Sequence, residues 1–408
     1  MPDENVSVGS MRLKIASFLM FLARWRLGWI KEDKKGRSLV KRLTRMGMFF
    51  VKVGQVMSVQ HNWLSQDVIG QLRALQRNVP AGRPIINPQT LLARGIDVEP
   101  EPFACGSIAC VYRGTYKGAP VAVKIVRASV RSEFEATREC LREFKRCTSW
   151  LSCDTIANLK GFMDVIVAVM HDQIDLTHEV ANWRKLVALY DDRIVLPHIY
   201  TEVSDEHVIC MEYIDGDTIE DIKALAVSDA TIYDKIFTDV AEFTFDSMLV
   251  TRTFHADAHP GNMFWRKSDH KLGFFDFGIV QDVDKTLADT VLRFYVHMFA
   301  RNVPEMAKAL TGMLCSADAT VERAIGDALR LRLDQVGGGF QVTQKIAEIV
   351  LSCKARLNHD ATLINVNIMT MNSMFSSIND CFDVIGVIKR HIKQLIVDDL
   401  IDIDAVIG

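Results

Sequence analysis

The segment from Phe254 to Gly278 constrains this chain more than any other part of it. It reads FHADAHPGNMFWRKSDHKLGFFDFG and carries Asp257, then Asn262 five residues later, then Asp276 nineteen residues after the first Asp. The alternating apolar residues of KLGFFDF predict a short strand that ends at Asp276. The expected order is therefore a polar loop, a hairpin and a second polar loop.

This spacing is typical of kinase-type enzymes that transfer a phosphoryl group. In that chemistry one Asp lies near the attacking hydroxyl or water, an Asn holds Mg²⁺, and a second Asp holds metal against the phosphates. We therefore predict a catalytic Asp257 and metal binding by Asn262 and Asp276. A zinc site at His255, Asp257 and His259 is the first alternative. The Pro-Gly that follows argues against it, because the two His would not share a helix face. The second alternative is a chance turn at DFG.

An apolar strand with a single charge is predicted at residues 119–126, which read APVAVKIV. The charge is Lys124, which is costly in such a strand unless its ammonium reaches an anion, and ATP phosphates supply one. The alternative is an edge-strand lysine that points to solvent. The preceding residues, 103–118, predict a strand, a small-residue turn and a second strand. The turn is where a phosphate-covering loop should lie, and its residues are Ala104, Cys105, Gly106 and Ser107.

Residues 207–216, HVICMEYIDG, predict another apolar strand that runs into an acidic turn. In a kinase this is the last strand of the small lobe, followed by the hinge. Met211 would then line the adenine pocket, and backbone groups of Glu212, Tyr213 and Ile214 would bond the adenine edge. A simple buried strand is the alternative. Neither G-x-x-x-x-G-K-[ST] nor G-x-G-x-x-G occurs, so P-loop and Rossmann interpretations lack their central feature.

Five collinear segments resemble the UbiB-type atypical kinases, the AarF-domain kinases associated with coenzyme Q and isoprenoid lipid metabolism. They are VKVGQVMS at 51–58, LQRNVPAG at 75–82, GSIACVY at 106–112, VAVK at 121–124, and HADAHPGN with DFG at 255–278. The resemblance implies an α+β, bilobal protein-kinase-like fold. Its small N-lobe is β-rich, its C-lobe is mostly helical, and a helical N-terminal extension precedes both. The cofactors it implies are ATP or ADP with Mg²⁺.

The resemblance also assigns roles by position. It implies that Lys124 contacts the ATP phosphates and pairs with a glutamate. We expect that glutamate to be Glu179, with Asn182 beside it, although Glu139 and Glu143 on the helix after Lys124 are nearer in sequence.

The K-x-G-Q motif places Lys52 and Gln55, by resemblance, in the space where other kinases bind a peptide. That leaves room for water or for a small or lipidic acceptor. Without the family, residues 46–57 would be interpreted as an amphipathic helix with a buried face. Two departures bear on the chemistry: Gln173 stands where the family has a carboxylate, and Cys105 and Gly106 replace alanines of the loop that sets ATP or ADP preference.

The composition favours a large enzyme. With 408 residues and 49% apolar content, the chain can bury the core of two lobes. A net charge of −3 gives no reason to expect nucleic acid. Nine cysteines without C-x-x-C spacing favour free thiols in an intracellular reducing compartment. The predicted parts are a basic-apolar segment 1–40, an extension 41–100 with the K-x-G-Q motif, an N-lobe 101–215 and a C-lobe 216–408.

Residues 11–31 bear on membrane contact. Their uninterrupted apolar run is too short to span a bilayer, and Arg24 and Arg26 follow it. Trp25 and Trp29 beside basic residues suit an interfacial helix, and a helix packed on the protein's own surface is the alternative. A cleaved signal peptide is less favoured because charges follow the apolar run immediately. Acidic residues at the N-terminus do not support mitochondrial targeting.

Three functions remain open from the sequence. The first is a Mg-ATP-dependent phosphotransferase or ATPase acting on water, a lipid or an isoprenoid small molecule. The second is a nucleotide-binding pseudokinase scaffold, which would have no need of a metal-ready Asp pair. The third is a conventional protein kinase. The K-x-G-Q extension and the lack of an A-P-E-like segment after DFG argue against it. The sequence does not identify a protein partner.

Overall fold

The computed structural model divides into two compact units. The first contains Met1–Val180 and His198–Tyr213, and the second contains Ala181–Pro197 and Ile214–Gly408. The residues that the structure describes are 8–26, 38–39, 41–45, 50, 84–106, 108–148, 167, 171, 174–189, 192–218, 230–258, 260–266, 268–316, 318–333, 346, 348–350, 352–353, 355–379 and 382–401. A unit that contains a five-stranded sheet and helices, together with a mostly helical unit, makes the α+β fold that the sequence predicts, and this fold class is confirmed.

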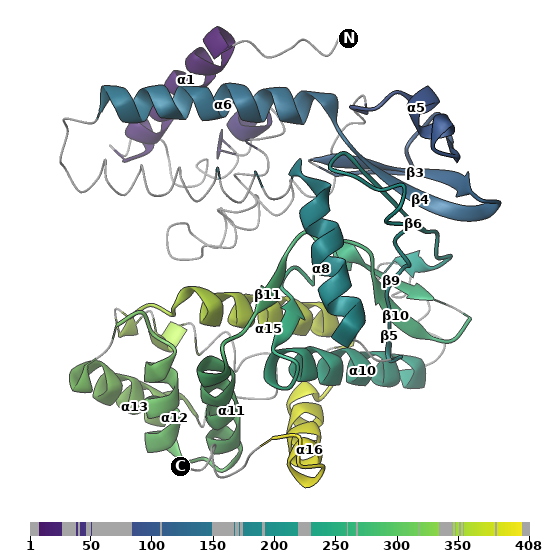
Figure 1. The fold of residues 1–408 in the computed structure, drawn as a ribbon. Helices are drawn as coiled ribbons and strands as arrows, with labels where there is room; N and C mark the ends of the chain where they lie inside the picture. The colour runs from purple at the N-terminus through teal and green to yellow at the C-terminus, as the bar shows by residue number, and fades with distance from the viewer. Residues whose placement is uncertain are drawn as a thin grey trace. The chain divides into compact units, whose positions relative to one another are not determined.

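The first unit is built on an antiparallel sheet (Figure 1). The strand order is β1-β3-β4-β6, and β2 pairs with β3. The strands are β1 (Ile96–Val98), β2 (Ala104–Cys105), β3 (Ala109–Tyr116), β4 (Ala119–Val126) and β6 (Val208–Glu212). The strands predicted around Lys124 and Met211 are therefore present. Alternation of side chains gives this sheet two distinct faces.

One face of the sheet forms a core. Val121, Val123 and Ile125 of β4 are buried, and they pack with Tyr112 and Cys210 of the neighbouring strands. The side chains between them point to the opposite face, because successive residues of a strand alternate. Lys124 belongs to that opposite face. The apolar strand thus holds its charge on the side away from the core.

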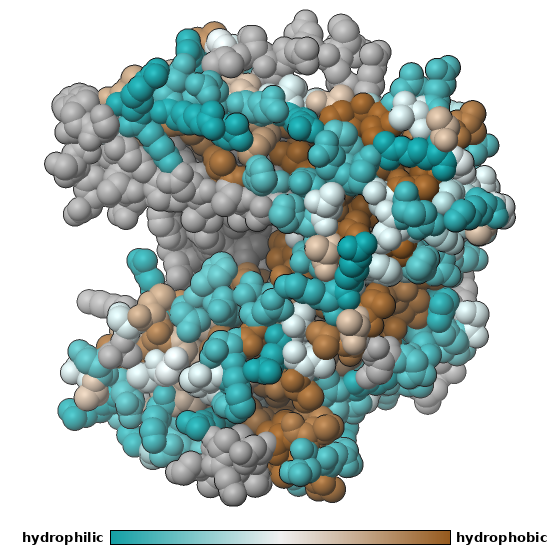
Figure 2. Space-filling view, in the orientation of Figure 1, coloured by the Kyte–Doolittle hydropathy of each residue, from teal (hydrophilic) through white to brown (hydrophobic). Residues whose placement is uncertain are grey.

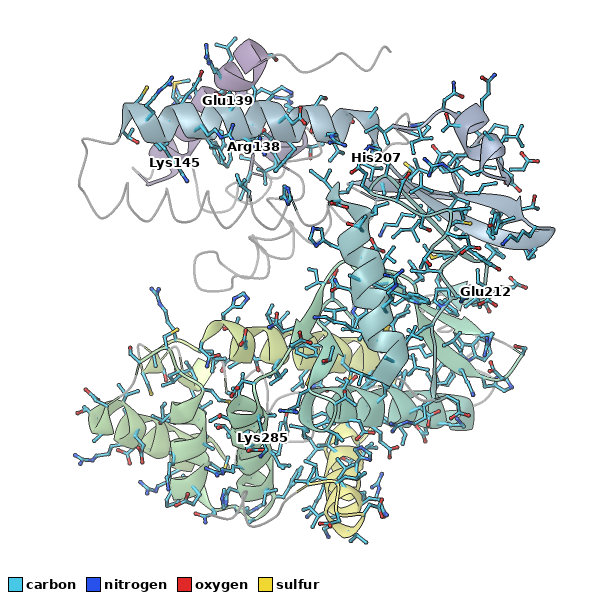
Figure 3. The ribbon with its side chains drawn as sticks, viewed as in Figure 1. Arg138, Glu139, Lys145, His207, Glu212 and Lys285 are labelled. Carbon is cyan, nitrogen blue, oxygen red and sulfur yellow. A yellow bond between two sulfur atoms is a disulfide. The ribbon has the colours of Figure 1, made fainter. Side chains whose placement is uncertain are left out.

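The helices of the first unit include α1 (Val8–Arg26), α5 (Pro88–Ala93) and α6 (Ala128–Cys147). Helix α1 packs across α6 (Figure 1). Arg12 of α1 pairs with Glu143 of α6. Helix α6 is amphipathic, and hydrophilic residues cover most of its visible face in Figure 2. Arg138, Glu139 and Lys145 project from it in Figure 3. Within the described part of the chain, no helix has the length and apolar character needed to cross a membrane.

The second unit contains a small mixed sheet with the order β5-β10-β9-β7. Its strands are β5 (Ile194–Val195), β7 (Asp217–Thr218), β9 (Met263–Arg266) and β10 (Lys271–Phe274). Strand β10 is the one predicted before Asp276. A Cβ at Gly273 would lie 2.3 Å from the Phe264 ring and 2.6 Å from the Val195 carbonyl oxygen, so the close approach of these strands requires glycine there.

A two-stranded sheet of β8 (Thr253–His255) and β11 (Val280–Asp282) flanks the DFG segment. The helices of this unit are α10 (Ala230–Leu249), α11 (Lys285–Phe299), α12 (Val303–Gly312), α13 (Ala319–Leu333), α15 (His359–Ile378) and α16 (Val384–Val397). The side chains of Asp284, Asn302, Asn358 and Asp383 cap four of them. The mostly helical character predicted for the C-lobe is confirmed for its described residues.

The prediction of free thiols is wrong at one pair. Cys105 and Cys110 form a disulfide, and their Cα atoms are 4.2 Å apart. The two residues are cross-strand partners in β2 and β3. The spacing C-x-x-x-x-C does not by itself predict a disulfide, because only the hairpin register brings the two side chains together. Cys210, Cys315 and Cys353, in the part of the chain that the structure describes, are free cysteines.

Candidate functional site: kinase-like motifs in two units

Lys124 and Glu179 form an ion pair in the first unit. The Nζ atom of Lys124 lies 2.8 Å from Oε1 and 2.8 Å from Oε2 of Glu179. The two side chains are only 14% and 6% exposed. Strand β4 presents Lys124, and the first turn of α8 (Leu176–Leu189) presents Glu179. A carboxylate in the first turn is favoured by the helix dipole, so α8 stabilises the acidic member of this pair.

Helix α8 begins at a local capping arrangement. Asp175 accepts hydrogen bonds from the backbone N–H of Thr177 at 2.9 Å and from its hydroxyl at 2.6 Å. Burial alone would raise the pKa of Asp175, but the two bonds from Thr177 and the nearby His178 and His171 lower it overall. Asp175 therefore stays ionised at neutral pH and fixes the turn that carries Glu179.

The two other glutamates considered as partners of Lys124 are engaged elsewhere. On α6, Glu143 pairs with Arg12, and Glu139 accepts from Arg142 at 3.2 Å. Of the three glutamates, Glu179 is the one that contacts Lys124.

The predicted phosphate-covering loop is a tight hairpin between β2 and β3. The backbone N–H of Gly106 donates to the carbonyl of Ala109 at 2.8 Å. The Gly106 carbonyl accepts from Arg127 Nη1 at 3.1 Å. The N–H of Gly106 is therefore used inside the hairpin, contrary to the expectation that backbone donors here approach phosphate. Ala104 and Cys105 belong to β2, whereas Ser107 lies outside the described residues.

The end of β6 carries the predicted adenine-binding residues. Met211 is buried and pairs with Ala122, which shares the face of Lys124. The N–H of Glu212 (labelled in Figure 3) donates to the carbonyl of His198 at 2.8 Å, and the N–H of Tyr213 donates to that of Pro120 at 3.2 Å. These two donors are used by the sheet and its edge. Ile214, the third predicted residue, belongs to the second unit.

Asp257 and Asn262 lie together in the second unit. A 3₁₀ turn at Pro260–Asn262 brings the Nδ2 atom of Asn262 to 3.0 Å from the carbonyl oxygen of Asp257 and 3.3 Å from its Oδ2. Asn262 is 7% exposed, and its carbonyl accepts from the N–H of Phe275 at 3.2 Å. Asn262 thus connects the loop of Asp257 to the segment that leads into DFG.

Asp276 follows β10 and is held by its own loop. Its Oδ1 accepts from the N–H of Gly278 at 2.9 Å, and a Cβ at Gly278 would lie 3.1 Å from that oxygen. His255 connects the loop of Asp276 to the loop of Asp257. Its Nε2 bonds the carbonyl of Asp276, and its Nδ1 accepts from the N–H of Asp257 at 3.2 Å. The tautomer with its proton on Nε2 satisfies both contacts, because Nδ1 then accepts and Nε2–H donates. Both ring nitrogens are used, which excludes His255 from the zinc site considered in the sequence.

Two asparagines complete the arrangement of the second unit. Asn182 of α8 donates from Nδ2 to the carbonyl of Phe277 in DFG at 2.9 Å. Asn367 of α15 donates from Nδ2 to the carbonyl of His255. The sequence places Asn182 beside Glu179 but gives it no role. Nothing in the sequence marks Asn367, because its partner is 112 residues away.

The side chains of Asn262 and Asp276 fit a magnesium ion by their chemistry. They supply amide and carboxylate oxygens, which are the hard donors that Mg²⁺ prefers. Among the described residues, no cluster of three or more His, Cys, Asp or Glu side chains is arranged to hold a metal. Lys52, Gln55, His259 and Gln173 lie outside the described residues.

The fold and these motifs define a protein-kinase-like domain. The family model of the ABC1 atypical kinase-like domain matches residues 96–310, more than half of the chain. The chain therefore belongs to the ABC1 atypical kinase-like family, and the resemblance drawn from its motifs is confirmed.

Curated relatives share modest identity with this chain. It is 25% identical over 300 residues to Protein ACTIVITY OF BC1 COMPLEX KINASE 3, chloroplastic, of Arabidopsis thaliana, covering 69% of this chain and 41% of that protein. It is 27% identical over 312 residues to Probable protein kinase UbiB of Aeromonas salmonicida, covering 69% and 56%. The chain thus spans only about half, or less, of the length of these relatives.

A solved structure shares the fold. The complex of Rv3197 with erythromycin from Mycobacterium tuberculosis aligns with a TM-score of 0.53 and 19% identity, covering 90% of this chain and 97% of that one. The likeness shows a shared fold over 90% of this chain.

Proposed function

We propose that this chain binds Mg-ATP and catalyses phosphoryl transfer or ATP hydrolysis, with an acceptor related to isoprenoid or quinone lipids rather than a protein. The observation that carries the proposal is the Lys124–Glu179 ion pair at 2.8 Å. A lysine in an otherwise apolar strand, held by a buried glutamate on a helix, is the arrangement that fixes an ammonium group for nucleotide phosphates.

The residues of the second unit support the same chemistry. Asp257 is half-buried and bonded to Asn262, so its carboxylate is oriented to accept a proton from, or align, an attacking hydroxyl or water. Asn262 and Asp276 are the residues that would hold Mg²⁺. Bound Mg-ATP would supply the phosphoryl group and the divalent charge that offsets its negative charge. His255 keeps the loops of Asp257 and Asp276 in fixed relation through its two ring nitrogens.

The lipid acceptor rests on two supports. One is membership of a family in which a similar protein is named UbiB, together with the K-x-G-Q motif at Lys52 and Gln55. The other is α1, whose Leu13 and Met20 are 75% and 59% exposed on a helix that also bears Arg12 and Arg24. An exposed apolar stripe beside basic residues suits a peripheral contact with an anionic membrane.

A nucleotide-binding pseudokinase scaffold is the second candidate. The hairpin at Gly106 favours it, because a backbone donor expected to cover phosphate is bonded to Ala109. Such a scaffold would bind the nucleotide without turning it over.

Phosphate release from Mg-ATP by the purified full-length chain tests the proposal, with and without vesicles of anionic lipid. We expect turnover that disappears in Asp276→Asn and persists in Asp327→Asn, a matched change at an exposed aspartate of α13 that pairs with Arg330. Stimulation by vesicles would support the lipid acceptor. If the wild-type chain binds ATP but releases no more phosphate than Asp276→Asn, the scaffold replaces the enzyme.

A further inference from the structure

The face of the first-unit sheet that lies opposite the buried core carries a second cation besides Lys124. Arg113 of β3 pairs with Ala122 of β4, and Val111 pairs with Lys124. Arg113 and Lys124 therefore share the face opposite the buried core, and their positions are one strand repeat apart, roughly 7 Å along the strands. The face that would receive a nucleotide thus has a cation near each end.

Two aromatic rings hold Arg113. Its Cζ atom lies 5.5 Å from the ring centre of Phe103 and 5.2 Å from that of Tyr213. The two rings meet edge to face, with centres 6.1 Å apart. In the part of the chain that the structure describes, Arg113 makes no ion pair with a carboxylate. Its guanidinium is therefore oriented by the rings, while its N–H donors are not committed to a charge.

A hollow opens beside this group of residues. It has a volume of about 420 Å³, and its lining includes Arg113, Tyr213, Asp97 and Glu99. Phe103, at the edge of the group, is 49% exposed, which is unusual for so large an apolar side chain. A planar heteroaromatic ring would cover Phe103 and the guanidinium together. The hollow is within the size range of small-molecule sites.

The charges along this face indicate which end of a nucleotide would lie where. Asp97 and Glu99 line the hollow and repel phosphate, whereas Lys124 attracts it. The N–H groups of Glu212 and Tyr213 already donate within the sheet and at its edge, so they cannot recognise the edge of a base. A guanidinium plane and aromatic rings on this face are suited to hold a base by stacking.

We propose that Arg113 is a specificity-determining residue that binds the base of the nucleotide. Phe103 and Tyr213 hold its guanidinium flat, and the base stacks on it while Lys124 binds the phosphates. This inference rests on the proposed nucleotide-binding function and adds the residue that distinguishes a nucleotide from a bare polyphosphate. A purine, with its larger surface, stacks more strongly on this group than a pyrimidine.

Calorimetric titration of the full-length chain with Mg-ATP and with Mg-tripolyphosphate, which lacks base and ribose, tests the role of Arg113. We expect Arg113→Ala to weaken ATP binding about 10-fold and to leave tripolyphosphate binding unchanged. Arg113→Lys keeps the positive charge but loses the planar guanidinium group on which the base stacks, so ATP binding should stay weakened. Phe103→Leu should weaken ATP binding in the same selective way.

The matched control is Arg142→Ala, which removes an exposed arginine of α6 that bonds Glu139. It should change neither affinity, and circular dichroism establishes that each variant is folded. The inference is overturned if Arg113→Ala leaves the affinity for ATP unchanged. It is also overturned if Arg113→Ala weakens the binding of ATP and of tripolyphosphate equally and Arg113→Lys restores the binding of both. If the wild-type chain binds neither ligand, the proposed function itself fails.

Discussion

Asn367 on α15 donates a hydrogen bond from its side-chain amide to the backbone carbonyl of His255, 112 residues earlier in the chain. Both side chains are almost fully buried, at 2% and 3% exposure. The ring of His255 in turn contacts the loops of Asp257 and Asp276 through its two nitrogens. A residue outside the span matched by the family model therefore supports the loop that carries the candidate catalytic aspartate.

Replacing Asn367 by Ala removes this donor and leaves the His255 carbonyl buried. We expect a loss of about 2 kcal/mol in the free energy of unfolding, because an unsatisfied buried polar group costs about 1–3 kcal/mol. If Asp257 is catalytic, kcat should fall with little change in KM for ATP, since nucleotide contacts are untouched. Urea denaturation and steady-state kinetics measure the two effects.

Asn365→Ala is the control on the same helix. Among the residues that the structure describes, its amide contacts Met369 Sδ, at 3.5 Å, and we expect a change in unfolding free energy below about 0.5 kcal/mol. Equal losses of stability and kcat in the two variants would contradict the specific role of Asn367.

The Lys124–Glu179 pair should show strong coupling. Removing one member of a buried pair leaves the other charge without compensation, which costs about 3–5 kcal/mol. We therefore expect Glu179→Ala to lose about 3 kcal/mol of unfolding free energy, and Lys124→Met a similar amount. The double variant should lose much less than the sum, because both charges are gone.

A double-mutant cycle by chemical denaturation measures this coupling. The comparison pair is Lys117 and Glu202, which lie 3.1 Å apart but are 69% and 51% exposed. Solvent screens exposed pairs, so the losses at Lys117 and Glu202 should be nearly additive. Additive losses at Lys124 and Glu179 would show that the two charges do not stabilise each other.

The sequence predicts the strands around Lys124, Met211 and Asp276 because alternating or continuous apolar runs carry a direct signal of strand formation. It also points to Glu179 through a motif. It does not predict the bond from Asn367 to His255, since a single buried asparagine has no periodic pattern. The Cys105–Cys110 bridge is missed for a related reason: only the hairpin register places the two side chains opposite each other. Contacts that depend on tertiary packing cannot be predicted from the pattern of a single sequence.

The disulfide predicts a measurable change in the hairpin on reduction. Reducing the chain should expose two additional thiols to titration, and Cys105→Ala should abolish this difference. Loss of the cross-link frees a short hairpin, so we expect amide exchange at Gly106 and Ala109 to accelerate after reduction. Hydrogen-exchange mass spectrometry follows these amides. Exchange that is identical in the oxidised and reduced chains would mean that the bonds of Gly106 to Ala109 and Arg127 hold the hairpin without the bridge.

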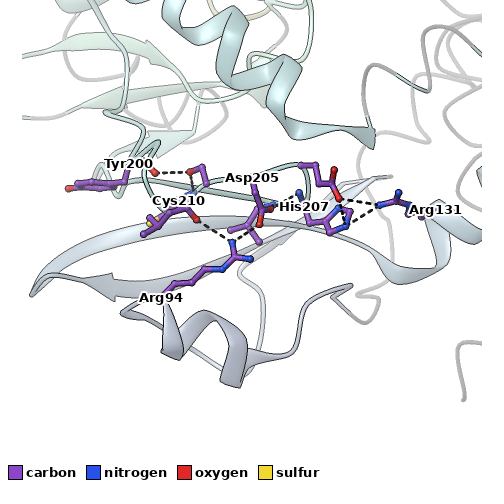
Figure 4. A network of polar contacts seen from close by, with 10 residues as sticks. Arg94, Arg131, Tyr200, Asp205, His207 and Cys210 are labelled. Carbon is purple, nitrogen blue, oxygen red and sulfur yellow. Dashed lines mark hydrogen bonds and ion pairs between the residues drawn. The ribbon is translucent and has the colours of Figure 1, made fainter.

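Asp205 gives the first unit a dependence on pH. It accepts from the N–H groups of His207 and Val208 at 2.8 and 3.0 Å and pairs with Arg94 at 2.6 Å (Figure 4). Burial is the largest single influence and would raise the pKa of Asp205. The bonds from His207, Arg94 and Val208 outweigh it together, so the pKa is lowered.

A lowered pKa in the folded state means that the unfolded state binds the proton first as pH falls. The stabilisation from Asp205 is therefore complete at neutral pH and is lost as pH falls through the folded pKa, below the usual carboxylate range. Because Asp205 is 36% exposed, solvent screening limits its contribution to about 1 kcal/mol. Asp205→Asn should be less stable than wild type at pH 7, and the difference should shrink towards pH 3. Asp192→Asn, at a 94% exposed carboxylate, should show no such trend in urea denaturation. A difference for Asp205→Asn that stays constant with pH would place its origin in packing rather than in charge.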